Sequence, residues 1–366
     1  SFGQKDGVYQ IGSAQDFKDF AALVNSSEPY ACAELTTDID LGLIDLGEGT
    51  DGVMIGKDGQ DFQGTFDGKG HSITINYFSG SGNGTALFRN VGIKALIQNL
   101  KVQGTITSTT KFAAGIAAWN SGNIRGCFVD VNVVSSVAGD ATHAGIAAVA
   151  YRGTVIENCL AKFTINGATT QNCGGLVGWC ENRINIANCL VINDGSSFDI
   201  SNGGSANIGR NVGNLTSVDL EKYNADPYAN RPTGATSNNY VTNQWGDNVA
   251  TTVVPYDELA DGKICYQLNT DQSKINWVQR IGTDPFPVPA PFGTGQVYAS
   301  GATGCDGKAE GDLTYSNAGT VQATAHTFDK YGVCTTCGCF NFDYEFDHKD
   351  RAIILKTADD IFRAEG

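Results

Sequence analysis

The chain has 366 residues, enough for one large domain and one or two small ones. Hydrophobic residues make up 41% and charged residues 17%, so the chain is too apolar and too weakly charged to be disordered. The 24 basic and 39 acidic residues give a net charge of −15, which repels phosphate backbones and excludes nucleic acid as a partner. We expect no integral membrane segment, because no apolar run is long enough, and the start Ser-Phe-Gly predicts a trimmed mature chain.

Residues 1–61 are predicted to form an N-terminal cap of strand, helix and strand. Residues 7–11 are typical of a strand, and Ser13 with Asp16 resembles a helix capping box. Apolar residues then follow at the i, i+3, i+4 and i+7 spacing of one helix face: Phe17, Phe20, Ala21 and Val24. This amphipathic helix is expected to cover the open end of the first repeat unit.

A repeat of about 30 residues fills positions 62–246. In one register, a small residue precedes an aliphatic residue at Ala86, Gly115, Gly145 and Gly175. In a second register, the equivalent residues are Leu100, Cys127, Cys159 and Cys189. Each unit holds short alternating segments and no helical periodicity, and units stacked in parallel bury one continuous column. The sequence therefore predicts an all-β fold, a right-handed parallel β-solenoid.

Three segments resemble a known family. They are Gly-Thr-Phe-Asp-Gly-Lys-Gly-His at 64–71, Asn-Cys-Leu at 158–160 and 188–190, and Gly-Gly-Leu-Val-Gly at 174–178. They look like the GLUG-motif proteins, surface or secreted β-solenoids of gut bacteria. The second and third repeats read Gly-Ile-Ala-Ala where the fourth reads Gly-Leu-Val-Gly. The resemblance covers about residues 7–290, and it implies the fold and extracellular display more strongly than any activity.

The cysteines of the repeats are expected to point inward. Free cysteine behaves as a small hydrophobic residue, so Cys127, Cys159 and Cys189 would form a core ladder, with ligand or disulfide chemistry as the alternative. Four further cysteines receive no assignment: Cys32, Cys173, Cys180 and Cys265.

The rest of the chain divides into an insertion and three C-terminal segments. The insertion at about 193–237 contains Tyr223 and Tyr228, candidate ligand contacts if it is more than a solvated loop. Residues 247–300 are predicted to form a C-terminal cap and residues 301–340 a Cys/His knuckle. Residues 341–366 are similar to the opening of the N-terminal cap, which predicts the start of a truncated following module.

The knuckle offers ligands for a structural zinc ion. Three thiols and one imidazole suit a tetrahedral site: Cys305, His326, Cys334 and Cys337. Disulfides are the first alternative in an exported protein, with Cys339 as an additional partner, and free thiols are the second. No organic cofactor is expected.

The repeats suggest no catalytic residues. Glycosidase chemistry needs two carboxyl groups across the scissile bond, whereas the outward residue Asp130 is expected to face Lys162 on the next coil. None of the histidines stands beside an expected nucleophile: His71, His143, His326 and His348. No nucleophile elbow, zinc-protease or phosphate-loop motif is present.

Two tryptophans indicate a candidate binding surface. Trp119 and Trp179 share one column with Val149, about 9.6 Å apart at the spacing of parallel strands. If the column points outward, the indoles form platforms for sugar rings; the alternative is that both pack inside.

These patterns predict an exported bacterial protein, secreted or held at the cell surface or outer membrane, that acts as a non-catalytic adhesion or glycan-binding β-solenoid. Its expected partner is a glycan or a host or cell-surface molecule, and the chain is expected to be monomeric. The first alternative is a β-helix carbohydrate-active enzyme, either a polysaccharide lyase or a glycoside hydrolase. The second is a structural spacer in a longer surface protein.

Overall fold

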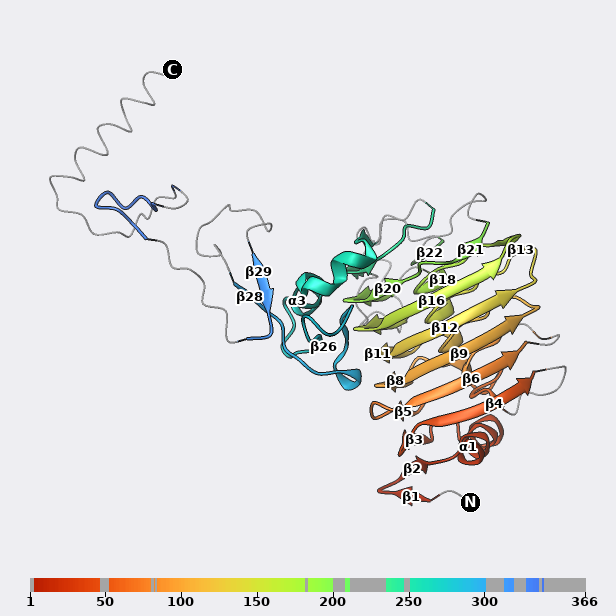
Figure 1. Ribbon diagram of the computed structural model, residues 1–366. Coiled ribbons are helices and arrows are strands. Elements are labelled where there is room, and N and C mark those ends of the chain that lie inside the picture. Colours follow the sequence, from red (N-terminus) through yellow and green to blue (C-terminus); the bar gives the residue numbers. More distant parts are fainter. Residues whose placement is uncertain are drawn as a thin grey trace, which may run out of the picture.

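The computed structural model describes residues 3–46, 53–79, 82, 84–181, 184–199, 208–210, 235–246, 251–300, 313–318, 327–335 and 338. In this part of the chain, short strands stack coil upon coil, with a helix at the N-terminal end and a helical segment at one side (Figure 1). The predicted all-β fold, a parallel β-solenoid, is confirmed. Its right-handed winding stays a prediction.

Three sheets run the length of the solenoid. Sheet A contains, in spatial order, β1 (Gln4–Lys5), β2 (Val8–Ile11), β3 (Cys32–Leu35), β5 (Thr65–Asp67), β8 (Leu96–Gln98), β11 (Asn123–Arg125), β15 (Val155–Glu157), β19 (Asn185–Ala187) and β23 (Ala235–Ser237). Sheet B contains β4 (Ile39–Asp45), β6 (Ser72–Phe78), β9 (Lys101–Ser108), β12 (Phe128–Ser135), β16 (Leu160–Gly167), β20 (Leu190–Ile192), β24 (Tyr240–Val241) and β25 (Thr252–Val253), with β21 (Ser197–Phe198) beside β16. Sheet C contains β7 (Phe88–Val91), β10 (Ala117–Asn120), β14 (Ala147–Ala150), β18 (Val177–Cys180) and β22 (Ile208–Arg210).

The strand register confirms the repeat of about 30 residues. In sheet C, Ala117 pairs with Ala147, which pairs with Val177, each thirty positions further along the chain. The neighbours within the three sheets are parallel, apart from the antiparallel hairpin of β1 and β2. A smaller parallel pair, β13 (Gly139–Asp140) and β17 (Thr170–Gln171), lies between sheets B and C in chain order. Equivalent residues of successive coils therefore stand side by side.

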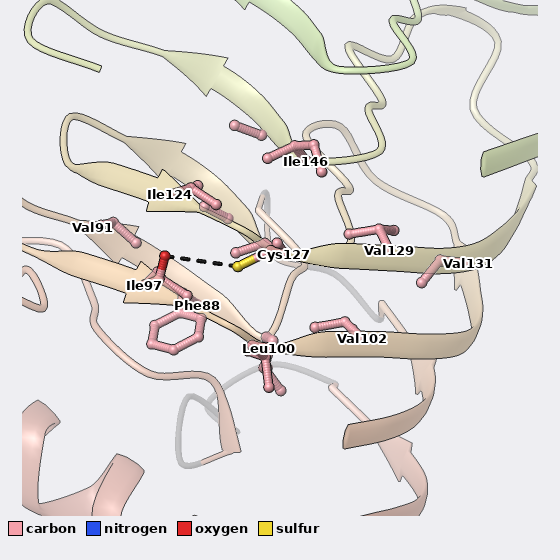
Figure 2. Close-up of a cluster of buried hydrophobic side chains, with 14 of the residues drawn as sticks. Phe88, Val91, Ile97, Leu100, Val102, Ile124, Cys127, Val129, Val131 and Ile146 are labelled. Atoms are coloured by element: carbon pink, nitrogen blue, oxygen red, sulfur yellow. Dashed lines mark hydrogen bonds between the residues drawn. The ribbon is translucent and has the colours of Figure 1, made fainter. Parts of the chain in front are cut away.

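One continuous apolar core fills the solenoid. Aliphatic residues from all three sheets meet in it, and Phe88, Ile97, Leu100, Val102 and Ile124 are fully buried (Figure 2). The apolar residues of sheet B alternate with polar ones on the outer face, as a half-buried strand requires.

The predicted cysteine ladder is present in this core. Cys127, Cys159 and Cys189 are fully buried free thiols. Each sulfur lies near two backbone oxygens, as in Cys127, whose Sγ is 3.4 Å from Arg125 O and 3.7 Å from Ile97 O (Figure 2). Burial raises the pKa of the Cys127 and Cys189 thiols, which keeps them protonated and unreactive.

An asparagine occupies the turn that precedes the ladder position in several coils. Asn99, Asn158, Asn188 and Asn238 have positive φ angles of 52–56°. Asparagine tolerates this left-handed conformation better than other residues with side chains, because its short amide bonds locally. Their side chains also connect coils, as Asn238 Nδ2 donates to Asn188 Oδ1 at 2.7 Å. The corners thus depend on asparagine as well as on the abundant glycine.

The predicted N-terminal helix is α1 (Ala14–Ser26). Ser13 Oγ accepts a hydrogen bond from Asp16 N at 3.1 Å, and Asp16 Oδ2 accepts from Gly12 N at 3.0 Å. The apolar face is fully buried, and the ring centroid of Phe20 lies 6.0 Å from that of Phe66 in β5. The helix therefore covers the core at the end of the solenoid (Figure 1).

Residues 254–300, called the flank segment below, pack against the side of the solenoid (Figure 1). The segment contains η2 (Tyr256–Asp261), α3 (Lys263–Asn269), β26 (Trp277–Val278), β27 (Val288–Pro289), η3 (Ala290–Phe292) and β28 (Tyr298–Ser300), and β28 pairs with β29 (Thr314–Ser316). The C-terminal cap expected at residues 247–300 stays a prediction, and the described part of this range contacts the outer face of sheet B.

Outward residues of sheet B explain this position. Phe128, Leu160, Leu190 and Tyr240 form one column of paired residues and join an apolar cluster with the flank segment. Trp277, the segment's fully buried anchor, donates from Nε1 to Asn188 O at 3.1 Å and to Asn158 Oδ1 at 3.2 Å. The flank segment thus binds both the apolar column and the asparagine corner.

Substitution of Trp277 tests this anchor. Trp277→Phe should lower the free energy of unfolding by about 1–3 kcal/mol, because acceptors on Asn158 and Asn188 lose their donor. Trp277→Ala should lower it by about 3–5 kcal/mol, because a cavity is added. Urea unfolding followed by circular dichroism measures both changes. Tyr256→Phe, at an exposed position of the same segment, is the control, and a Trp277→Phe variant as stable as the native chain would contradict the assignment.

Candidate functional site

The outer face of sheet C carries the predicted tryptophan column. Trp119 pairs with Val149, and Val149 pairs with Trp179. The neighbouring residues Ala117 and Val177 belong to the core, whereas Trp119 packs against a separate cluster of small residues on the outer side of the sheet: Ala86, Ala114, Ala118, Ala144 and Ala148. Both tryptophans are half-buried. The structure therefore supports the outward alternative.

Two more aromatic rings join the tryptophans in one row. Phe112 lies 4.4 Å from Trp119 between ring centroids. Tyr151 lies 6.3 Å from Trp119 with nearly parallel planes, at 11°, and 6.3 Å from Trp179 at 72°. All four rings are half-buried. We call Phe112, Trp119, Tyr151 and Trp179 the aromatic row.

Tyr151 was not among the predicted site residues. It follows Val149 by two positions, just after β14 has ended, so a strand register alone does not place it beside the tryptophans. One feature of the sequence could have predicted this ring. Val149 is small and stands between two tryptophans in the column, so it leaves a space that a large side chain nearby can fill. Burial and the carboxylate of Glu181 raise the pKa of Tyr151, which keeps its hydroxyl protonated and able to donate a hydrogen bond.

Small residues make room for the row. A Cβ atom at Gly84 would lie 2.7 Å from Trp119 Nε1, so glycine at this position leaves room for the indole. Lys111 Nζ lies 4.8 Å from the centroid of Phe112 and forms an ion pair of 2.9 Å with Asp140. Packing against Gly84 positions Trp119, and the Lys111 side chain packs against Phe112. The geometry of this end of the row is therefore fixed before any ligand binds.

The other predicted site residues lie elsewhere or outside the described part of the chain. Tyr223 and Tyr228 fall outside the described residues, as do Cys305, His326 and Cys337. Cys334 is described, is buried and lies opposite Phe328 in a short antiparallel bridge. Within the described residues, no group of three or more metal-binding side chains was found. Asp130 and Lys162 are register neighbours, as predicted.

A serine and a histidine lie close together, which the sequence analysis did not foresee. Ser135 Oγ is 2.8 Å from His143 Nε2, and Ala113 N donates to His143 Nδ1 at 3.2 Å. Because Nδ1 accepts from a backbone amide, the neutral ring carries its proton on Nε2 and donates it to Ser135. The fully buried His143 therefore cannot remove the serine proton, and the pair is structural rather than hydrolytic.

Comparisons with known proteins add the following findings. No family model matches the chain, and no curated protein matches it. Among solved structures, a Bacteroides ovatus protein named "putative immunoglobulin A1 protease" is similar, with a TM-score of 0.46 and 16% identity over 79% of this chain and 94% of that one. A likeness at this level carries no argument about function. Within the described residues, no helix is long and apolar enough to cross a membrane.

The buried His143 predicts a pH-dependent stability. Burial lowers its pKa to about 3, from an ordinary value of 6.5, so the unfolded chain binds this proton more tightly than the folded one. The free energy of unfolding should be unaffected by this group above pH 6.5 and should fall as the pH drops toward 3, by roughly 4–5 kcal/mol in all.

Urea unfolding between pH 7 and pH 5 measures this slope. The variant His143→Gln should lose it, whatever its stability at neutral pH, and the half-buried histidine variant His71→Asn should keep it. An unchanged slope in His143→Gln would contradict the assignment.

Proposed function

We propose that this chain is a non-catalytic, glycan-binding β-solenoid of an exported bacterial surface protein, and that the aromatic row is its binding surface. The observation that supports the proposal is the alignment of half-buried rings along one face at the spacing of successive coils. Indole and phenol rings offer flat apolar faces with a polar edge, which suits the apolar face and hydroxyl rim of a sugar ring. A glycan would lie along the solenoid axis, because the rings follow that axis.

The negative charge of the chain agrees with this class of ligand. A net charge of −15 disfavours polyanions, whereas neutral sugars need no charge complementarity. Preformed packing around Trp119 also lowers the entropic cost of binding, since the rings are already ordered by Gly84 and Phe112.

Removal of the indoles tests the proposal. Trp119→Ala and Trp179→Ala should each weaken glycan binding about tenfold or more, because each removes one stacking platform worth about 1.5 kcal/mol. A glycan array identifies a ligand, and calorimetry then gives the affinities. Tyr30→Ala removes an aromatic side chain that is 59% exposed and far from the row in the sequence, and it should leave binding unchanged.

Two results of this experiment would decide between functions. Equal binding by the native chain and both tryptophan variants would overturn the aromatic row as the site. No binding to any glycan by the native chain would favour the second alternative, a structural spacer.

The alternative of a carbohydrate-active enzyme has one observation in its favour. Burial and the neighbouring Asp58 raise the pKa of Asp61, and such a pair of carboxyl groups is the equipment of a glycosidase. The two aspartates belong to one short turn at an end of sheet C, however, rather than to opposite sides of a cleft. Release of reducing ends from a bound polysaccharide, abolished in Asp61→Asn, would establish the enzyme instead.

We also propose that Cys305, His326, Cys334 and Cys337 bind a structural zinc ion. Elemental analysis should find about one zinc ion per chain, lost in Cys334→Ser and retained in the control Cys32→Ser. Removal of zinc by a chelator should expose three additional thiols to a thiol reagent. A chain without zinc in which these cysteines do not react until reduced would establish the disulfide alternative.

A further inference from the structure

A tight turn places two aspartates at the N-terminal end of sheet C. Lys57 and Gln60 form an antiparallel bridge with backbone hydrogen bonds of 3.1 and 2.9 Å, so Asp58 lies at the tip of the turn and Asp61 at its base. The turn is joined to β7 by bridges from the residues on either side of it: Ile55 pairs with Phe88 and Phe62 with Val91. Its position relative to sheet C is therefore fixed.

Asn90 connects this turn to the aromatic row. Asn90 is the register neighbour of Trp119, and it faces the outer side of sheet C because the next residue, Val91, points into the core. Phe62 N donates a hydrogen bond to Asn90 O at 2.9 Å, which places Asp61, the residue before Phe62, beside Asn90. A Cβ atom at Gly56 would collide with the carbonyl oxygen of Asn90, so glycine is needed for this close approach.

Asp61 and Asn90, called the polar pair below, therefore lie at one end of the aromatic row. Along the outer face, coil by coil, the column reads Asn90, Trp119, Val149 and Trp179, with Tyr151 beside Val149. Asn90 and Asp61 are both half-buried, so their remaining bonding capacity is partly open to a ligand. The aromatic rings mainly provide surfaces for stacking, whereas the Asp61 and Asn90 side chains provide hydrogen bonds and no stacking.

We infer that Asp61 and Asn90 form a polar subsite at the end of the aromatic row that binds a pair of neighbouring hydroxyl groups on a neutral sugar ring. This inference rests on the glycan-binding function proposed above. A carboxylate accepts two hydroxyl protons at once, and an amide both donates and accepts, which matches a vicinal diol. Asp61 presents a carboxylate to this subsite, and a carboxylate repels the carboxylate or sulfate of an acidic sugar.

The test compares neutral and anionic polysaccharides on the full chain. Xylan, galactomannan and mixed-linkage β-glucan serve as neutral probes, and polygalacturonate and heparin serve as anionic ones. The native chain should bind at least one neutral probe about tenfold or more tightly than either anionic probe. Asp61→Asn should weaken the neutral binding about tenfold, as expected for loss of a charge-assisted hydrogen bond, and should narrow the difference between the two classes.

Two further variants separate a binding role from a structural one. Asp257→Asn removes an exposed carboxylate in the flank segment and should change neither affinity nor selectivity. Asn90→Ala should weaken neutral binding like Asp61→Asn while retaining the wild-type near-ultraviolet circular dichroism of the aromatic row. If either Asp61→Asn or Asn90→Ala alters that spectrum, the ratio of the affinities for neutral and anionic polysaccharides still separates the two roles. A displaced aromatic row weakens binding of both classes of polysaccharide alike, whereas loss of the polar subsite weakens binding of the neutral class.

The outcomes distinguish this inference from the function on which it rests. Binding lost in Trp119→Ala but unchanged in affinity and selectivity in Asp61→Asn would overturn the polar subsite and leave the aromatic row in place. Equal binding of neutral and anionic probes by the native chain would also overturn it. Absence of binding to every probe would overturn the proposed function and the subsite together.

Discussion

The vertical register between coils is the constraint on which the rest of the structure depends. Parallel strands stack about 4.8 Å apart, so whatever residue one coil places at a position must tolerate its own equivalent above and below. In the core this favours small or aliphatic residues that interlock, as in the isoleucines of sheet A and the thiols of the cysteine ladder. On the outer face the same constraint converts a sequence period into a row of chemically similar side chains. The core and the candidate site are therefore two products of one repeat.

Much of the fold could be predicted from the sequence, because each repeat unit carries the same pattern and therefore indicates the same coil again. Two independent registers gave the coil length, and the cap helix was marked by Ser13 and a clear apolar face. The position of the flank segment could not be predicted in this way. It depends on an outward column, Phe128 to Tyr240, whose apolar character is visible only after the inward column has been assigned. Contacts between segments more than a hundred residues apart leave no periodic signal.

The candidate site shows the same division. Trp119 and Trp179 were found because they occupy equivalent positions of two coils. Tyr151 breaks the register by two positions, and Asp61 belongs to a turn outside the repeat, so neither follows from the period. The pair of Ser135 and His143 was missed because Ser135 ends β12 and His143 belongs to the connection that follows this strand. Beyond the ends of the strands, the backbone follows local turns. The repeat period therefore does not predict where a single side chain in these turns will lie.

The flank segment changes how the solenoid should respond to stress. A stack in which each coil touches only its neighbours behaves as a one-dimensional chain, and it can lose coils from an end one at a time. Here a single segment contacts Gly70 near the first coils through Pro291, Phe128 through Phe292, and Asn238 through Gln267. Fraying of the last coils therefore has to break contacts that also belong to the middle of the stack. The flank segment therefore couples the coils to one another, so that they unfold in one cooperative transition and not one coil at a time.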